Sequence, residues 1–163
     1  MKPAEVSTPS DREVLVKRSF DAPVNLVWQA YTDPALMRRW LTAMPGWSMP
    51  VCEMATHVGG KYRWRWRDEN GVEFGFTGEM LEVALHSKIV HTQIYDPGDG
   101  DFGSMGGEPS IITVTFNETN GITNVATSIK FASKADRDAA MSTGMTDGME
   151  MSYKVLDGVL GEM

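Results

Sequence analysis

The sequence predicts one α+β domain, with a curved antiparallel sheet of about six or seven strands and a long helix at the C-terminus. Three observations predict it. Apolar residues alternate with polar ones in several successive segments, which is typical of strands. Two short segments with helical spacing follow the first strand, and helical spacing then returns only after Ser133. Strands that follow one another directly favour an antiparallel sheet with helical cover over a βαβ fold.

The N-terminal part of the chain predicts a tail, a strand and two short helices. Residues 1–12 are polar, so we expect a disordered tail there and a single domain over 13–163. Asp33 and Pro34 supply an N-cap and a first helical residue for the second helix. The expected elements are a strand at 14–20 and helices at 24–31 and 34–40.

The middle of the chain predicts the remaining strands. Lys61–Arg67 is the clearest of them, because aromatic residues alternate with basic ones and so lie on one face. A turn at 68–71 leads into a strand from Val72 whose aromatic residues continue that face. The apolar alternation shifts phase near Gly78, which indicates a bulge or bend. Further strands are expected at 48–58, 87–95, 110–119 and 122–132, with a surface loop at 96–109.

The C-terminal part predicts a short helix, a kink and a longer helix. Ser133 and Asp136 have the spacing of a capping box, with Asp in place of the usual Glu or Gln. Gly144 and Gly148 destabilise a helix, so we expect the longer helix to begin at about Thr146.

Composition and charge restrict the partners. The net charge of −7 and the pI near 4.9 provide no basic surface for nucleic acid, so none is expected as a partner. Cys52 is the only cysteine, which excludes an intrachain disulfide and favours a reducing compartment, the cytoplasm. The sequence contains no apolar run of about 18 residues, so no membrane span is predicted. We expect no cofactor, no metal, and a monomer or homodimer.

Several short motifs occur in an order that resembles one known superfamily. In the N-terminal half they are Pro23-Val24, Val27-Trp28, Thr32-Asp33-Pro34, Trp40, Gly59-Gly60 and Tyr62-Arg63-Trp64. In the C-terminal half they are Phe76-Thr77-Gly78, Glu82-Val83, Ile89-Val90, Phe131, Ser133-Lys134, Arg137-Asp138, Thr143-Gly144-Met145 and Gly148-Met149. Together these motifs resemble the START-like (SRPBCC) superfamily, and within it the bacterial activator of heat shock protein 90 ATPase-like family.

The resemblance implies a helix-grip fold with an apolar cavity between the sheet and the C-terminal helix. It implies no single activity, because relatives include lipid carriers, cyclase domains, hormone receptors and co-chaperone domains. Relatives usually carry an Asp and an Arg before the double glycine, whereas this chain has Ala55 and His57. A role that depends on that charged pair is therefore not carried over.

The predicted cavity is lined by aromatic and methionine side chains. Aromatic rings offer large contact areas at low entropic cost, and Met adapts to varied shapes. From the residues alone, a filled core explains the same pattern as well as a cavity does. The predicted lining residues are Trp28, Trp40, Tyr62, Trp64, Trp66, Phe74, Phe76, Met145, Met149 and Tyr153.

Two other patterns have ordinary structural explanations. The basic residues of Arg63–Arg67 are expected on a solvated strand face, paired with Glu73 or Glu79 across the hairpin. Gly98–Gly103 matches G-x-G-x-x-G, but no helix follows to present its N-terminus to a pyrophosphate, so dinucleotide binding is not predicted.

Metal and nucleophile sites are not predicted either. The acidic residues of 96–101 lack the spacing of an EF-hand loop. Cys52 and His57 point to opposite faces of a strand and lack further ligands. His86 and His91 have no nucleophilic partner in the sequence, and each is expected to be a surface histidine or a hydrogen-bonded structural one.

Three functions remain open from the sequence. The favoured one is a non-catalytic binding protein that holds a small, largely apolar or aromatic ligand in the cavity. The second is a chaperone-interaction module, for which the Arg63–Arg67 face is the candidate surface. The third is an enzyme of cyclase or dehydratase type, which requires a buried acid or base that the sequence does not locate. We therefore assign no catalytic residues.

Overall fold

The computed structural model describes residues 1–42, 44–96 and 108–163, and it has the predicted α+β class. The helices are α1 (Val24–Thr32), α2 (Pro34–Trp40), α3 (Lys134–Met141) and α4 (Met145–Glu162). The strands are β1 (Glu5–Ser7), β2 (Glu13–Phe20), β3 (Ser48–Met54), β4 (Lys61–Arg67), β5 (Glu73–Ala84), β6 (Lys88–Asp96), β7 (Ser110–Thr119) and β8 (Ile122–Lys130). The predicted surface loop lies mostly outside the described residues.

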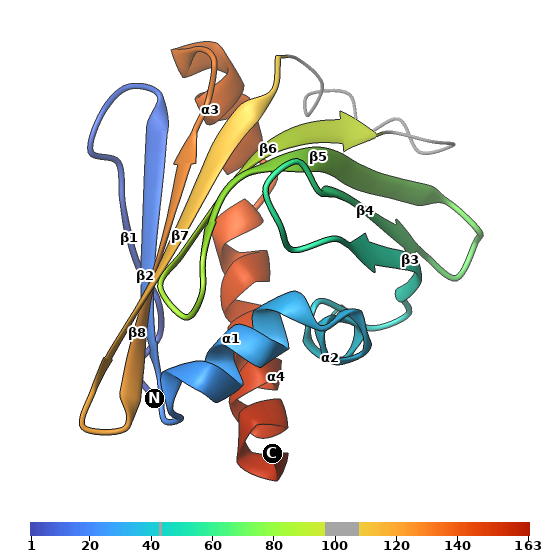
Figure 1. The fold of residues 1–163 in the computed structure, drawn as a ribbon. Coiled ribbons are helices and arrows are strands. Elements are labelled where there is room, and N and C mark those ends of the chain that lie inside the picture. The colour runs from blue at the N-terminus through green and yellow to red at the C-terminus, as the bar shows by residue number, and fades with distance from the viewer. Residues whose placement is uncertain (43, 97–107) are drawn as a thin grey trace.

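The described strands form one antiparallel sheet in the order β1-β2-β8-β7-β6-β5-β4-β3. It is an eight-stranded sheet, where six or seven strands were expected. The sheet is curved, and α4 lies within the curve while α1 and α2 cross one end of it (Figure 1). Helix α4 packs against both α1 and α2 as well as the sheet. The concave face of the sheet therefore encloses the core together with the helices.

The additional strand is β1, which lies in the segment predicted to be disordered. Glu5–Ser7 pair with Leu15–Lys17 of β2, and the amide of Ala4 donates to Glu150 Oε1 at 2.8 Å. All three residues of β1 are exposed, so the segment has no apolar alternation to reveal it. Its backbone hydrogen bonds hold it in place. The prediction of a disordered tail over 1–12 is wrong for these residues.

The bend of the sheet lies in β5, where a glycine and a bulge follow one another. A Cβ at Gly78 would lie 2.5 Å from Tyr62 Cε1 and 2.1 Å from the carbonyl oxygen of Thr92, so only glycine fits there. The pairing register with β6 then shifts between Met80 and Glu82. The irregularity expected near Gly78 is therefore present, just beyond that residue.

Two strands end earlier than predicted. Strand β3 ends at Met54 because residues 55–60 form a turn, in which the amide of Gly60 donates to the carbonyl of His57 at 2.8 Å. Strand β8 ends at Lys130 rather than at residue 132.

The predicted interruption before the C-terminal helix is present. Ser133 is the N-cap of α3, and its hydroxyl accepts from the amide of Asp136 at 3.1 Å. Gly144 separates α3 from α4 with a φ of 79°, a left-handed conformation that glycine adopts without steric cost. Helix α4 then buries Tyr153 and Leu156 against the core.

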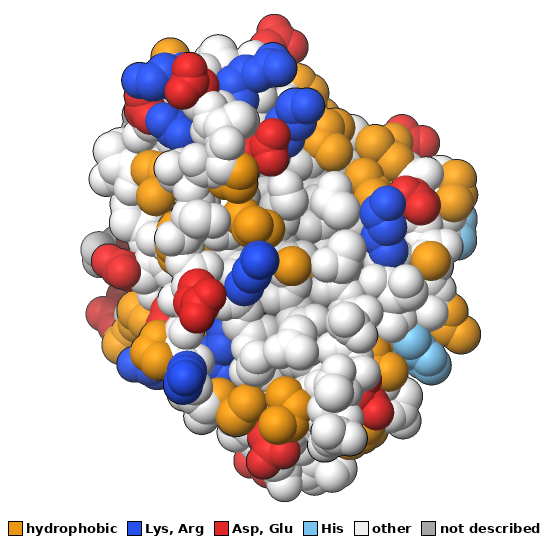
Figure 2. Space-filling view, turned by 90° about the vertical axis from the view of Figure 1, so that its left-hand side faces the viewer, with side chains coloured by type: hydrophobic (Ala, Val, Ile, Leu, Met, Phe, Trp, Pro, Cys, Tyr) orange, Lys and Arg blue, Asp and Glu red, His pale blue; other side chains and the backbone are white. Residues whose placement is uncertain are grey.

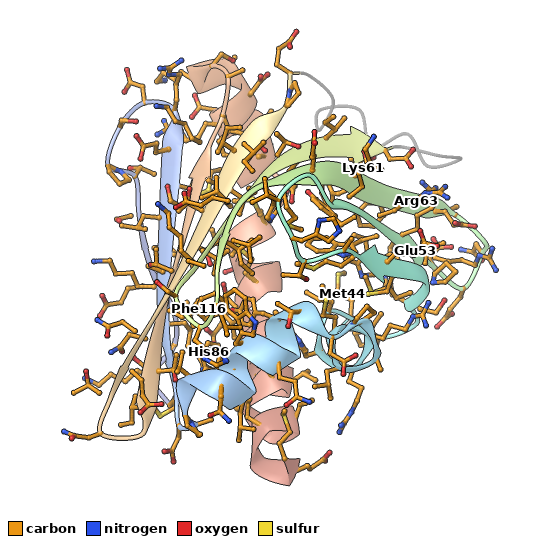
Figure 3. The ribbon with its side chains drawn as sticks, viewed as in Figure 1. Met44, Glu53, Lys61, Arg63, His86 and Phe116 are labelled. Carbon is orange, nitrogen blue, oxygen red and sulfur yellow. The ribbon has the colours of Figure 1, made fainter. Side chains whose placement is uncertain are left out.

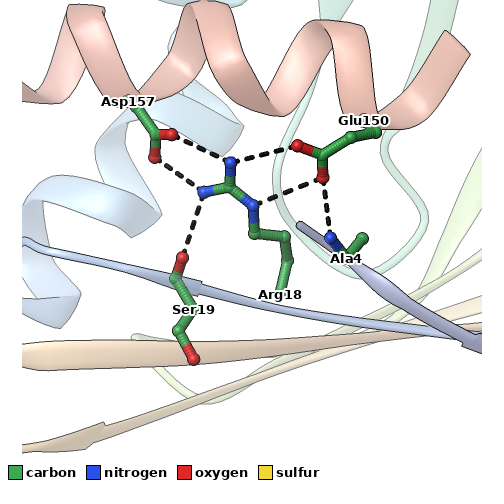
Figure 4. A network of polar contacts seen from close by, with 5 residues as sticks. All are labelled: Ala4, Arg18, Ser19, Glu150 and Asp157. Carbon is green, nitrogen blue, oxygen red and sulfur yellow. Dashed lines mark hydrogen bonds and ion pairs between the residues drawn. The ribbon is translucent and has the colours of Figure 1, made fainter. Parts of the chain in front are cut away.

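A buried arginine fixes α4 to the sheet (Figure 4). Arg18 lies on the inner face of β2 with Val16 and Phe20, and only 2% of its side chain is exposed. Its guanidinium donates to Asp157 Oδ1 at 2.7 Å and to Glu150 Oε2 at 3.3 Å. Its hydrogen bonds to these carboxylates, led by that to Asp157, raise the pKa of Arg18. The group therefore stays charged beneath the helix.

Candidate functional site

A small pocket lies between the sheet and α4, on the side of β4 and β5. Its volume is about 120 Å³. The sheet contributes Trp66 and Phe74, and α4 contributes Gly148 and Ser152. The segment between α2 and β3 contributes Leu41, Thr42, Met44 and Trp47. Met44 is 52% exposed and lies beside α2 in Figure 3, so the pocket is open to solvent on this side.

The pocket exists because small residues of α4 stand opposite large aromatic residues of the sheet. Gly148 and Ser152 are one helical turn apart and so lie on one face of α4. A Cβ at Gly148 would meet no atom within 4 Å, which leaves space in front of the aromatic rings. Any larger side chain at these two positions would occupy that space.

The aromatic side of the pocket is a contiguous set of rings. Trp66 and Phe74 stack at a centroid separation of 5.3 Å, and Trp47 meets Phe74 edge to face at 5.4 Å. The indole Nε1 of Trp66 donates to the carbonyl oxygen of Leu41 at 3.0 Å. This hydrogen bond fixes the ring against the segment that follows α2. A flat apolar surface results, which suits a planar ligand group.

The predicted lining residues fall into three groups. Those at the pocket are Trp66 and Phe74. Those buried in the core are Trp28, Trp40, Tyr62 and Tyr153. Those that are half-buried and pack against the core are Trp64, Phe76, Met145 and Met149. Their part in ligand binding stays a prediction.

The core contains buried polar side-chain groups. Trp64 Nε1 is buried and has no hydrogen-bond partner among the described residues, and the hydroxyl of Tyr31 is buried beside Tyr153. Burial raises the pKa of Tyr31, and the neighbouring Tyr153 adds to the rise. Burial likewise raises the pKa of Tyr153. Both phenols therefore stay neutral and are poor candidates for a general base.

His91 is the one histidine of the three that is buried. Its Nδ1 donates to the carbonyl oxygen of Thr92 at 2.8 Å, and the hydroxyl of Tyr62 donates to the same oxygen at 2.7 Å. Its ring lies edge to face with Tyr62, at 4.8 Å between centroids. Burial lowers the pKa of His91, so the ring stays neutral in the core. His91 does not line the pocket. This position agrees with the expectation that it is a hydrogen-bonded structural histidine.

Basic residues of β4 pair with Glu73 as expected, but one of them, Arg65, is buried and not solvated as expected. Arg65 and Arg67 both pair with Glu73, at 3.1 Å and 2.7 Å. Arg65 is not solvated, since only 8% of its side chain is exposed. Gly75 lies opposite Arg65 in β5, and the guanidinium reaches beyond it to Asp96 Oδ2 on β6 at 2.7 Å. Three strands are tied together by this side chain.

In the part of the chain that the structure describes, no cluster of three or more potential metal ligands occurs. Cys52 is buried with Met37 and Met49, and burial raises the pKa of its thiol. Residues 97–107, which contain the Gly98–Gly103 motif and two acids of the 96–101 cluster, lie outside the described residues. No described helix is long and apolar enough to cross a membrane.

The charges on the face seen in Figure 2 are mixed in sign. Basic and acidic side chains gather together at the end that carries α3. There Asp138 pairs with Lys134 at 3.2 Å and with Arg137 at 2.9 Å. Arg137 also donates to the carbonyl oxygen of Ser10 at 3.0 Å. These side chains neutralise one another.

The sequence interpretation missed most of the pocket. Leu41, Thr42, Met44 and Trp47 lie outside regular elements and follow no periodic pattern. Gly148 and Ser152 could have been identified from the sequence, because these two small residues at i and i+4 interrupt an otherwise apolar helix face. That interruption was the available signal for a gap between the helix and the sheet.

A curved antiparallel sheet around a C-terminal helix, with an aromatic pocket between them, is the architecture of the START-like proteins. Within that class the chain belongs to the family of Activator of Hsp90 ATPase homolog 1-like proteins, whose model matches residues 21–161. No curated protein matches the chain.

Solved structures share this fold along the whole chain. A protein of Rhodobacter sphaeroides is 28% identical, covers 99% of this chain and 100% of its own, and has a TM-score of 0.90. A protein of Mycobacterium smegmatis is 21% identical, with 97% of each chain covered and a TM-score of 0.82. A protein of Nitrosomonas europaea is 22% identical, covers 95% of this chain and 97% of its own, and has a TM-score of 0.80.

Proposed function

We propose that the protein is a non-catalytic binding protein of helix-grip architecture, which holds one apolar ring of a small molecule between the sheet and α4. The observation that carries this proposal is a gap between α4 and the sheet. Gly148 and Ser152 lie on the helix side of the gap, and the stacked rings of Trp66 and Phe74 lie on the sheet side. A filled core would need larger residues at these helix positions. We further propose that it works in the cytoplasm, on the basis of its single, buried cysteine.

The size of the pocket limits what can enter. A cavity of about 150 Å³ in another protein binds benzene, so the 120 Å³ found here matches a single ring. Drug-sized ligands need pockets of about 300–1,000 Å³. A larger ligand therefore inserts one ring and leaves its remainder at the mouth, beside the exposed Met44.

No observation favours a chaperone-interaction module over this proposal. The surface that the sequence suggested for it uses Arg65 and Arg67 in ion pairs within the chain. The enzyme alternative gains no support from the pocket, because none of the residues that line it is an acid or a histidine.

A thermal-shift screen tests the proposal, with tryptophan fluorescence as the second measurement. The panel contains fatty acids, flavonoids, sterols and aromatic polyketides. A ligand at a hundred times its dissociation constant adds about 2.7 kcal/mol, which raises Tm by roughly 5–10 °C at this chain length. Quenching is expected as well, because Trp66 and Trp47 line the pocket.

Two variants at one position locate the binding. Ser152→Met fills the pocket and is expected to abolish the thermal shift, whereas Ser152→Ala keeps the space and should retain it. Both variants should stay folded, because Ser152 is only half-buried. An absence of shifts across the whole panel, or an undiminished shift in Ser152→Met, would overturn the proposal.

A further inference from the structure

A second hollow lies on the opposite face of the sheet, across β3, β4, β5 and β6. Its volume is about 460 Å³, which is within the range of small-molecule sites. Side chains alternate along β4, so the buried Tyr62 faces the core while Lys61 and Arg63 face outward. Glu53, Lys61 and Arg63, which belong to this hollow, are labelled on β3 and β4 in Figure 3. The hollow is therefore separate from the pocket beside α4.

Tyr62 of β4 and small residues of β5 and β6 line the hollow together with long charged residues. Thr77, Gly78 and Thr92 lie on the central strands β5 and β6. The charged residues at the rim are Glu53, Lys61, Arg63 and Glu79, and all four are exposed. Ile94, which is 43% exposed, lines the same hollow and adds an apolar contact.

Opposite charges face one another at the rim without closing into ion pairs. Lys61 is the cross-strand partner of Glu79, and Arg63 is the cross-strand partner of Glu53. None of these four side chains forms an ion pair within 4 Å in the described part of the chain, although Arg65 and Arg67 further along β4 do. Two cations and two carboxylates thus remain available to a ligand at the surface.

We infer that this hollow binds a short zwitterion, an amino acid whose carboxylate and ammonium groups are a few bonds apart. The carboxylate is held by Lys61 and Arg63, which lie two residues apart on one face of β4. The ammonium is held by Glu79, one strand away, at a strand spacing of about 4.8 Å. Apolar parts of the ligand cover Ile94. Because the hollow is open, salt weakens this binding.

Titrations followed by ¹H–¹⁵N correlation spectra of the full chain test this inference. The ligands are glycine, β-alanine and γ-aminobutyrate, up to tens of millimolar at constant ionic strength. Acetate and methylammonium, which carry one charge each, are the controls. We expect the zwitterions to shift the amide signals of Thr77, Gly78 and Thr92 in a saturable way, and the single-charge ions, which make only one of the two charged contacts, to shift them much less. Non-saturating shifts, or equal shifts with acetate, would overturn the inference.

Charge-removing variants then assign the contacts. Replacing both Lys61→Gln and Arg63→Gln should weaken binding at least about tenfold, the effect of about 1.4 kcal/mol. Lys130→Gln, at another exposed lysine of the same sheet, is the matched control and should bind like the parent. If the double variant does not fold, Glu79→Gln tests the site instead, because it removes the carboxylate that is proposed to hold the ammonium group. Unchanged affinity in either test would show that these charges do not form the site.

Discussion

Arg18 of β2 and Asp157 of α4 form a bidentate ion pair, with Nη1 to Oδ1 at 2.7 Å and Nη2 to Oδ2 at 2.9 Å. The pair joins the second strand to the last helix, which are far apart in the sequence. Glu150, seven residues before Asp157, adds a second carboxylate and also binds the amide of Ala4. The N-terminal strand, the sheet and the helix therefore meet at one guanidinium, and the position of α4 beside the pocket depends on it.

Removal of the two carboxylates should destabilise the fold more than removal of the arginine. Glu150→Gln with Asp157→Asn leaves a buried guanidinium without a counter-charge, which costs about 3–5 kcal/mol. Arg18→Met leaves carboxylates that are 19% and 32% exposed and can hydrate, so we expect a loss of only about 1–3 kcal/mol. Urea denaturation measures the free energy of unfolding of both variants.

An exposed ion pair supplies the control for these variants. Arg39 of α2 pairs with Glu162 of α4, and their side chains are 45% and 66% exposed. Arg39→Gln should change the free energy of unfolding by no more than about 0.5 kcal/mol. Equal losses from the carboxylate and the arginine variants would contradict the proposed role of burial.

Gly78→Ala should destabilise the sheet at its bend. The added methyl would lie 2.1 Å from the carbonyl oxygen of Thr92 and 2.5 Å from the ring of Tyr62, and at least one of these groups must move. Movement of the ring breaks its hydrogen bond to Thr92. We expect a loss of about 1–3 kcal/mol in urea denaturation. Gly121→Ala cannot serve as the control, because the φ of 80° at Gly121 would strain an alanine even without a steric clash. A neutral result would mean that β5 can bend without a glycine.

Gly148→Ala should act in the opposite direction on stability. Gly148 lies inside α4 and has open space where the Cβ would stand, so alanine should stabilise the helix by about 0.5–1 kcal/mol. Gly158→Ala is the matched control, since Gly158 also lies in α4 with open space but away from the pocket. Thermal denaturation should show the same gain for both variants.

The same two variants separate stability from binding. The methyl of Gly148→Ala enters the pocket, so the thermal shift with a ring-containing ligand should decrease in this variant only. If Gly158→Ala reduces the shift equally, the pocket between α4 and the sheet is not the binding site.

The sequence was sufficient for elements that carry a periodic pattern and insufficient where tertiary contacts decide. Alternation located β4, and the aromatic face continues into β5 because Trp64 pairs with Phe76 and Trp66 with Phe74. Arg18 fits the inward period of β2, but its burial depends on Glu150 and Asp157 of α4, which the pattern of the strand does not reveal.

The parts that escaped prediction lack such patterns. Strand β1 has three exposed residues and forms because β2 offers an unpaired edge. The pocket depends on Leu41 and Met44, whose positions after α2 follow from how that helix packs against α4. Local propensity contains no information about either arrangement.

His91 should make the protein less stable at acidic pH. Burial lowers the pKa of the folded His91, while the unfolded residue titrates near its ordinary value of about 6.5. Below that value the unfolded chain binds a proton that the folded chain does not, so the stability contributed by neutral His91 is complete above pH 6.5 and is lost as pH falls towards the folded pKa.

His91→Asn tests this contribution, because an asparagine amide can donate to the carbonyl of Thr92 as Nδ1 does and carries no titrating group. Urea denaturation at neutral and mildly acidic pH should show a steeper loss of stability in the parent protein than in His91→Asn. His57→Asn, at an exposed turn, should follow the parent. If the parent and His91→Asn lose stability in parallel, the acid sensitivity comes from other groups, and the buried ring accepts a proton without cost to the fold.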